Sequence, residues 1–296
     1  MARSNNQFKR RSRQQRVGSI LFMLPSLISV FIFFVLPFFV VIYYSFIDNP
    51  VTAEFVGFQN YVNVAQNAAF KQASSNTLKF SFVAMPLAVV LSLILAMLLD
   101  RNIPLRSQLR TSFLTPMMVP VASIVLIIEV IFHSNGALNS FLVPLGFQKI
   151  DWLSSDHSPV VIIFLFLWKN MGYNMILFLS ALESVPRDIL EVATMESANA
   201  WQIFWHIKIR YLSPTILFVT ILSLINSFKV FREIYLISGD YPYPSLYMLQ
   251  HFMNNTFKSL DYHKLSTAAI YMSVVMVIII GALFLFENYF GKDVEE

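Results

Sequence analysis

Six long apolar runs determine what this chain can fold into. They lie at about residues 18–47, 80–99, 113–132, 160–182, 211–236 and 265–286. Each approaches or exceeds the roughly 20 residues that an α-helix needs to cross a bilayer, where unpaired backbone groups would find no water. The chain is 56% hydrophobic and only 13% charged, which excludes an ordinary soluble domain. We therefore predict an all-α, polytopic membrane protein with six transmembrane helices.

The distribution of lysine and arginine predicts the orientation of these helices. Thirteen of the 21 basic residues lie in the N-terminal tail, the 100–112 and 183–210 loops and the C-terminal tail, against five in the three opposite loops. Basic loops remain in the cytoplasm, so both termini are predicted to be cytoplasmic. The first run is too long for a signal-peptide core. We expect a basic tail (1–17), one transmembrane domain (18–290) and a short cytoplasmic tail (291–296).

What the sequence lacks excludes several kinds of chemistry. It has no cysteine, no glycine-rich lysine loop for phosphate, and no metal-ligand spacing among its five histidines. We therefore expect no metal site and no cofactor in this chain, which cannot hydrolyse ATP by itself. The net charge of +4 is concentrated in the N-terminal tail, so it indicates topology and not a nucleic-acid surface.

A polar, amphipathic insert at residues 184–214 separates the fourth and fifth runs. Ser184 suits a helix cap and Pro186 a first helical turn. Apolar residues then recur at helical spacing, which predicts a short helix with the stripe Ile189, Val192, Ala193 and Met195. A second, aromatic helix is predicted to begin at Trp201. The pattern alone equally fits an amphipathic turn that lies on the membrane surface.

Ionisable side chains occur within or at the edge of the apolar runs, namely Glu129, Lys169, Lys229, Arg232 and Glu233. Charges at such depths are costly unless they find a partner or face a cavity. In one interpretation they form ion pairs, Lys169 with Glu129 on the neighbouring span and Lys229 with Glu233 one helical turn away. In the other they line a polar translocation cavity. The sequence leaves both open.

Polar side chains also share one face of the fourth and fifth helices. The faces comprise Lys169, Asn170, Tyr173 and Asn174, and Ser223, Asn226, Ser227 and Val230. Amides and hydroxyls can bind sugar hydroxyls, and aromatic rings can pack on sugar C–H groups. The faces are therefore a candidate substrate pathway, although small polar residues also serve as contacts between membrane helices.

One segment of the insert carries a family resemblance. Glu191-Val192-Ala193 is followed by Ser197, by Ile207 and by Ile209-Arg210. This spacing resembles the cytoplasmic EAA loop of ABC-importer permeases, most closely the maltose-transporter type, where glycine stands at Ser197 and Leu-Pro at Ile209-Arg210. Glycine there permits a left-handed turn that serine adopts poorly, so we expect Asn199 to take over part of that role.

The resemblance implies one membrane-spanning half of an ATP-driven carbohydrate importer. It is similar to the first permease of a heteromeric pair, coupled to its ATPase through residues 186–205. The implied coupling residues are Glu191, Ala193, Glu196, Ser197 and Ala198. Alignment on Glu191 places the family's sugar-binding positions at Lys169, Asn170 and Tyr173, and at Ser223, Asn226, Ser227 and Val230. Lys169, with Lys229 nearby, suggests an acidic oligosaccharide.

The implied partners are a second permease, two ATPase subunits, a sugar-binding protein outside the membrane, and lipid. ATP and Mg would be bound by the ATPases. The alternative class is a secondary transporter driven by an ion gradient, with Glu129 and Lys169 as a proton relay. A missing inverted repeat argues against it. A third class, a membrane enzyme or sensor using Asp261 and His263, has only those two neighbouring side chains in its favour.

Overall fold

The computed structural model describes residues 22–101 and 103–290. Within them, six helical stretches are long and apolar enough to cross a membrane: Phe22–Ser45, Ala68–Asp100, Val121–Leu145, Ser158–Glu183, Ala200–Ser238 and Tyr262–Glu287. The prediction of an all-α chain with six candidate transmembrane helices is confirmed. The predicted tails, 1–17 and 291–296, and the start of the first run lie outside the described residues.

The helices follow one another with short connections. In chain order they are η1 (Phe31–Val35), α2 (Leu36–Ser45), α3 (Gln59–Gln66), α4 (Ala68–Asp100), α5 (Arg106–Met118), α6 (Val121–Phe132), α7 (Ala137–Leu142), η2 (Val143–Leu145), α8 (Ser158–Glu183), α9 (Arg187–Met195), α10 (Ala200–Ile203), η3 (Phe204–Lys208), α11 (Ile209–Phe228), α12 (Phe231–Ser238), η4 (Pro244–Leu246), α13 (Leu249–Lys258) and α14 (Tyr262–Phe290). Elements η1 and η3 are π-helical, and η2 and η4 are 3₁₀ turns. Within the described ranges, an isolated bridge between Ile47 and Phe55 is the β-type pairing that occurs.

The chain divides into two compact units. Of the described residues, the first unit holds 22–64 and 260–272, and the second holds 65–101, 103–259 and 273–290. In the first unit, the buried Asn60 amide donates hydrogen bonds to the carbonyls of Ser45 (3.1 Å) and Ile47 (2.7 Å). The Tyr61 hydroxyl lies 2.8 Å from that of Ser45, and the Tyr271 hydroxyl donates to the Tyr61 carbonyl. These bonds fasten the turn that follows α2.

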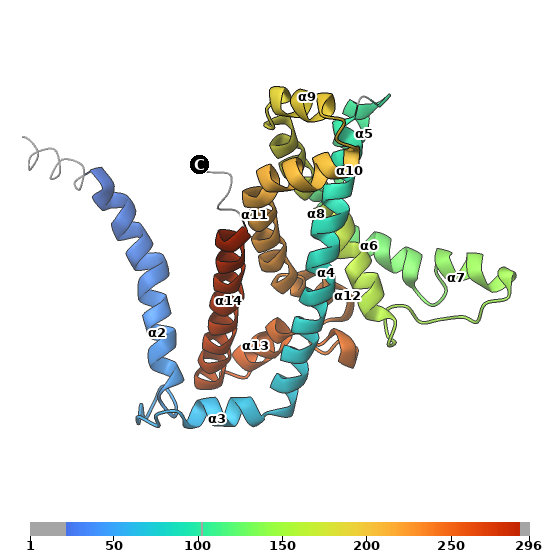
Figure 1. Ribbon diagram of the computed structural model, residues 1–296. Coiled ribbons are helices and arrows are strands. Elements are labelled where there is room, and N and C mark those ends of the chain that lie inside the picture. The colour runs from blue at the N-terminus through green and yellow to red at the C-terminus, as the bar shows by residue number, and fades with distance from the viewer. Residues whose placement is uncertain (1–21, 102, 291–296) are drawn as a thin grey trace, which may run out of the picture. The chain divides into compact units, whose positions relative to one another are not determined.

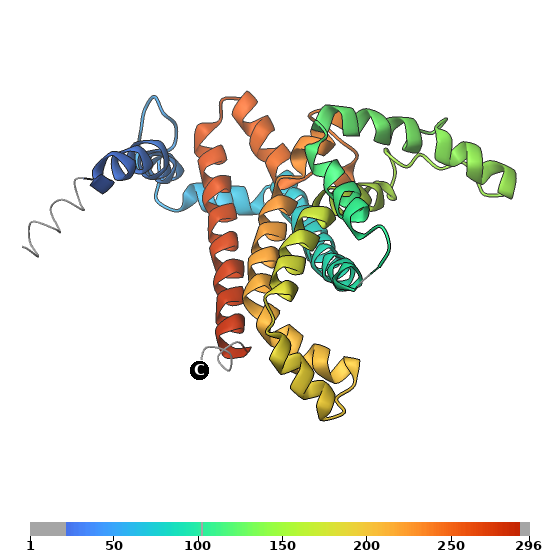
Figure 2. The ribbon, with the colours of Figure 1, turned by 90° about the horizontal axis from the view of Figure 1, so that it is seen from above.

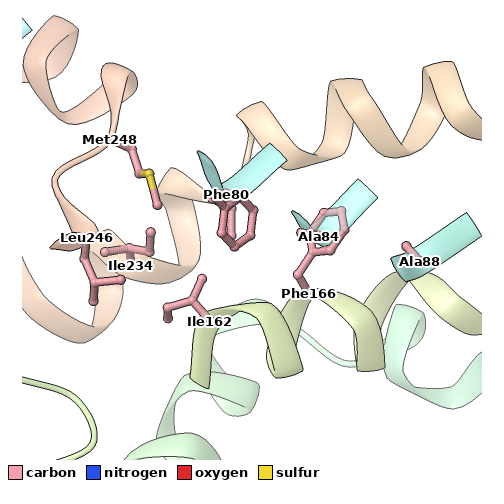
Figure 3. Packing of buried hydrophobic residues seen from close by; sticks show 9 residues of the cluster. Phe80, Ala84, Ala88, Ile162, Phe166, Ile234, Leu246 and Met248 are labelled. Atoms are coloured by element: carbon pink, nitrogen blue, oxygen red, sulfur yellow. The ribbon is translucent and has the colours of Figure 1, made fainter. Parts of the chain in front are cut away.

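The core of the second unit is built around α4, α8 and α11, which run side by side (Figures 1 and 2). Small residues let these helices approach closely: Ala84, Ala88 and Ala96 of α4 are fully buried. Figure 3 shows Phe80 of α4 against Phe166 of α8, whose rings meet edge to face with centroids 5.6 Å apart. Residues of α12 and of the segment before α13 complete this cluster.

Two of the predicted spans are interrupted. The third run breaks between α5 and α6, because Pro120 holds Val119 in an extended conformation. The candidate span there is Val121–Leu145, further along the chain than the predicted 113–132. The fifth run, predicted as one helix at 211–236, breaks between α11 and α12 at Lys229 and Val230. Hydropathy detects the apolar run but not this break, which contains neither proline nor glycine.

A buried histidine stabilises the start of α13. His251 is fully buried, and its Nδ1 accepts a hydrogen bond from the Met248 N–H at 3.2 Å. The ring lies edge to face with Phe231, with centroids 4.6 Å apart. Burial lowers the pKa of His251 from 6.5 to about 4, against a smaller opposing effect of the Asp240 charge. The imidazole is therefore neutral at physiological pH.

This histidine makes the fold sensitive to acid. The unfolded chain binds a proton at His251 near pH 6.5, whereas the folded chain resists protonation until about pH 4. Its contribution to stability is complete above pH 6.5 and is lost as the pH falls, by about 3 kcal/mol at pH 4. We expect thermal unfolding in detergent to show this loss, and His251→Gln to flatten it. His157→Gln, at an exposed histidine, is the matched control; an equal flattening there would contradict the assignment.

Candidate functional site

The polar faces of α8 and α11 meet inside the second unit. Asn174 donates to the Ser223 hydroxyl at 2.9 Å, and both residues are buried. Asn226 donates to the Asn170 side-chain oxygen at 2.9 Å, and these two are half-buried. The Ser227 hydroxyl donates to Ser81 of α4 at 2.7 Å. The bonds at Ser223 and Ser227 are contacts between helices, as in the alternative interpretation of these faces.

An ion pair joins α8 to α12. Lys169 Nζ donates to Glu233 Oε1; the Lys169 side chain is 28% exposed and that of Glu233 is 8% exposed. The second oxygen, Glu233 Oε2, is buried without a hydrogen-bond partner among the described residues. The buried charge of Glu233 is tolerated because the opposite charge of Lys169 is in direct contact with it.

This pairing corrects both predicted ion pairs. Lys229 does not pair with Glu233, because the break at Lys229 and Val230 removes the continuous helical turn that would align them. Lys169 does not pair with Glu129, because Glu129 lies on α6 and faces a pocket lined by His133, Asp151 and other residues. In place of the two predicted ion pairs, the structure has one ion pair, between Lys169 and Glu233, which lie 64 positions apart in the sequence.

The remaining pathway candidates fall into two groups. Val230 is buried in the cluster of Figure 3, where it packs among apolar side chains. Tyr173 and Lys229 are exposed, as is Arg232, which was a candidate for an intramembrane ion pair. Among the pathway candidates, those with free surface in the second unit by itself are therefore Tyr173 and Lys229, together with the half-buried Lys169, Asn170 and Asn226. Their role in substrate passage stays a prediction.

Helix α9 is the amphipathic helix of the 184–214 insert. It contains no buried residue, and its apolar side chains Val192 and Met195 are 55% and 85% exposed. Of the coupling candidates, Glu191, Glu196 and Ser197 are exposed, whereas Ala193 and Ala198 are half-buried. The second, aromatic helix does start at Ala200, but it continues through η3 into α11. The insert is thus one short helix followed by an extension of the fifth span.

Ser197 itself adopts the left-handed conformation at the end of α9, with φ of +63°. The Ala198 N–H bonds to the Ala193 carbonyl and the Ser197 N–H to that of Thr194, both at 3.0 Å, which is the Schellman arrangement. The expectation for Asn199 was wrong. Asn199 is extended and caps α10, exchanging hydrogen bonds with Gln202. An asparagine side chain is a strong N-cap, and this local bond decides its conformation.

We expect Ser197→Gly to stabilise the protein. The left-handed conformation costs a residue with a Cβ about 1 kcal/mol, and glycine adopts it without that cost. The free energy of unfolding in detergent should rise by about this amount, with the helices unchanged. Ser184→Gly is the matched control, since Ser184 ends α8 with φ of −84° and gains nothing from glycine. A loss of stability in Ser197→Gly would contradict the geometry.

Two groups of ion pairs join the helices beside α9, at one end of the second unit (Figure 1). Arg106 and Arg110 of α5 both donate to Glu183 Oε1, at 3.0 and 2.9 Å. Lys208 donates to Asp100 at the end of α4, at 3.0 Å. The predicted basic loops 100–112 and 183–210 therefore lie together. A positive-inside count indicates that they share a side of the membrane, but pairing of individual charges has no sequence signal.

Sequence reasoning missed two features of the site. Glu233 was assigned to Lys229, and no local signal could have matched it to Lys169 on another helix. Val192 and Met195 were seen as part of an apolar stripe but were not chosen as contact residues. Both side chains are exposed on α9, which makes them candidates for a contact surface, and the helical spacing of the stripe was the available signal.

Comparison with known proteins agrees with this architecture. The family model described as "Binding-protein-dependent transport system inner membrane component" matches residues 88–295. The arabinooligosaccharides transport system permease protein AraP of Bacillus subtilis is 29% identical over 75% of this chain and 72% of its own length. The lactose transport system permease protein LacF of Rhizobium radiobacter is 29% identical over 92% and 94%.

The same fold occurs in a solved structure. In the crystal structure of a bacterial alginate ABC transporter in complex with an alginate pentasaccharide-bound periplasmic protein, one chain superimposes with a TM-score of 0.78 and 21% identity. The match covers 96% of this chain and 96% of that one. At this identity the likeness establishes the fold.

Proposed function

Because this chain belongs to the family of binding-protein-dependent transport system inner membrane components, we propose that it imports a carbohydrate. As a member it is a non-catalytic, membrane-spanning transport subunit, and the gradient-driven alternative is not favoured. The names of the relatives AraP and LacF, an arabinooligosaccharide and a lactose permease, support a sugar as cargo. Amide and hydroxyl groups on α8 and α11 supply the hydrogen bonds that sugar hydroxyls require.

The proposed assembly contains this chain, a second permease, two ATPase subunits and a sugar-binding protein outside the membrane. ATP and Mg bind to the ATPases. Both termini and α9 face the cytoplasm of a bacterial inner membrane, and residues 18–290 form one transmembrane domain. The basic loops that meet beside α9 support this orientation.

The observation that carries the coupling proposal is the exposure of α9. An amphipathic helix normally buries its apolar stripe, yet Val192 and Met195 are exposed on a helix without a buried residue. A helix of this kind fits into a groove of a partner protein. We propose that α9 binds in a groove of the ATPase, with Glu191 and Glu196 as polar contacts. The turn at Ser197 and Ala198 sets the direction of the chain after α9.

Movement of α9 would reach the polar faces through α8 and α11. We assign the cargo path to the surface near Asn170 and Tyr173, at mid-length of α8, and Asn226, near the end of α11. Lys169 borders it, but its charge is balanced by Glu233. Ser223, Ser227 and Val230 support this surface from within the helix packing.

Co-purification of an ATPase tests the coupling proposal. The tagged chain is extracted from its own membrane, and the amount of ATPase that accompanies it is compared with that of Val192→Asp/Met195→Asp. We expect the double variant to lose the ATPase. Val62→Asp, at a similarly exposed valine of α3, is the matched control and should retain it. If no ATPase accompanies the native chain, the importer assignment fails.

A further inference from the structure

A pocket of about 470 Å³ is formed by residues of the second unit around the ends of α6 and α12. These two helices lie away from α9 in Figure 1. Four segments form it: the end of α6, the loop around residues 151–154, the end of α12 and residues 241–243. We call it the outer pocket. Its polar lining includes Glu129, His133, Asp151, Ser238, Tyr241 and Tyr243.

Glu129 is the unusual member of this lining. It belongs to the candidate span Val121–Leu145, and in the described part of the chain its carboxylate has no ion pair. An ionisable side chain at such a position is costly and is generally retained for a function. Here it faces the cavity one helical turn from His133, so the cavity supplies the polar environment that the carboxylate needs.

The other lining residues supply hydrogen-bonding groups and an aromatic ring, the contacts by which proteins bind sugars. Asp151 is held in place by accepting the N–H groups of Leu153 and Ser154, at 3.3 and 3.1 Å. Carboxylates accept bonds from sugar hydroxyls, while the hydroxyl of Ser238 both donates and accepts. Tyr241 is 81% exposed, so its ring is free to pack on sugar C–H groups. The volume is within the range of small-molecule sites.

The charge of the lining limits what kind of sugar fits. Two carboxylates face the cavity, and no lysine or arginine is among its lining residues. An anionic sugar would meet like charges at short distance. Deeper along α12, one turn before Ile237, Glu233 already balances the charge of Lys169. The two observations agree, and both oppose the acidic oligosaccharide that the lysines alone suggested.

We propose that the outer pocket is a saccharide subsite that takes an uncharged sugar ring before the cargo reaches the α8–α11 surface. The assignment rests on the proposed carbohydrate function and narrows it to neutral oligosaccharides. The subsite is separate from the mid-membrane positions implied by the family resemblance. Its binding groups are Glu129 and Asp151 as acceptors, and Tyr241 as the stacking ring.

Saturation-transfer NMR on the full chain in lipid nanodiscs tests the subsite. The probes are neutral trisaccharides of glucose, galactose and arabinose, and the trisaccharide of galacturonic acid as the anionic comparison. We expect at least one neutral probe to bind, with at least tenfold weaker binding in Tyr241→Ala/Glu129→Gln. The control Tyr43→Ala/Glu54→Gln changes the same residue types at exposed positions outside the pocket and should bind as the native chain does.

Four results would overturn the proposal. The acidic trisaccharide could bind as well as the neutral probes. Arginine amide, a cationic probe that the two carboxylates would attract, could bind in the pocket when the neutral sugars do not. Binding could persist in the pocket variant but disappear in Asn170→Leu/Asn226→Leu, which would leave the carbohydrate function intact and reject the subsite. Absence of binding by every neutral probe would also reject it, whereas the carbohydrate importer itself is judged separately by the ATPase co-purification.

Discussion

Replacing Glu233 by leucine lowers the free energy of unfolding by about 3 kcal/mol, because it leaves the charged, half-buried Lys169 without its partner. Within the apolar part of the second unit, water replaces the lost carboxylate poorly. The change is measured by titrating detergent-solubilised protein with SDS and following its helical circular dichroism. It should also weaken the attachment of α12 to α8, since this bond joins the two helices.

The double variant Lys169→Met/Glu233→Leu is the control for this prediction. It removes both charges and keeps the volume apolar, so its stability should lie close to that of the native chain. The difference between the two variants then isolates the cost of the unpaired lysine. If Glu233→Leu and the double variant are equally unstable, loss of packing and not the unpaired charge is responsible.

Replacing Gly172 by alanine destabilises the protein by about 3 kcal/mol or more, at the upper end of the cost of overpacking. A Cβ at this position would lie 1.8 Å from the Phe113 carbonyl oxygen and 2.5 Å from its carbon. These are backbone atoms of α5, so no side-chain rotation can relieve the contact. Helix α5 must move away from α8, and the SDS midpoint should fall accordingly.

Gly281→Ala is the matched control for this glycine. Gly281 is also within a long helix, α14, but a Cβ there meets no atom within 4 Å. Alanine favours helix over glycine by about 1 kcal/mol, so this variant should be as stable as the native chain or more stable. Equal behaviour of the two variants would show that α5 and α8 do not require their close approach.

The local features of this chain could be read from its sequence because their causes are local. An apolar run of about 20 residues becomes a helix in a bilayer wherever it occurs, and all six runs were found. Helix α9 was found from its stripe and its polar flanks. Asn170, Ser223, Asn226 and Ser227 make hydrogen bonds between packed helices, since polar side chains in apolar helices avoid lipid, and their assignment to the substrate pathway stays a prediction.

Other features depend on which helix lies beside which. Lys169 pairs with Glu233, which lies on α12 beyond the break at Lys229 and Val230, and neither proline nor glycine marks that break in the sequence. The outer pocket joins four segments separated in sequence, so Glu129 could be recognised as ionisable but not as part of a cavity. Local hydrogen bonds and runs of apolar residues involve residues that are close in the sequence, so the sequence alone predicts them. The partner of a buried charge, the closeness of Gly172 to α5 and the walls of a pocket arise from packing between distant segments, and the tertiary structure alone decides them.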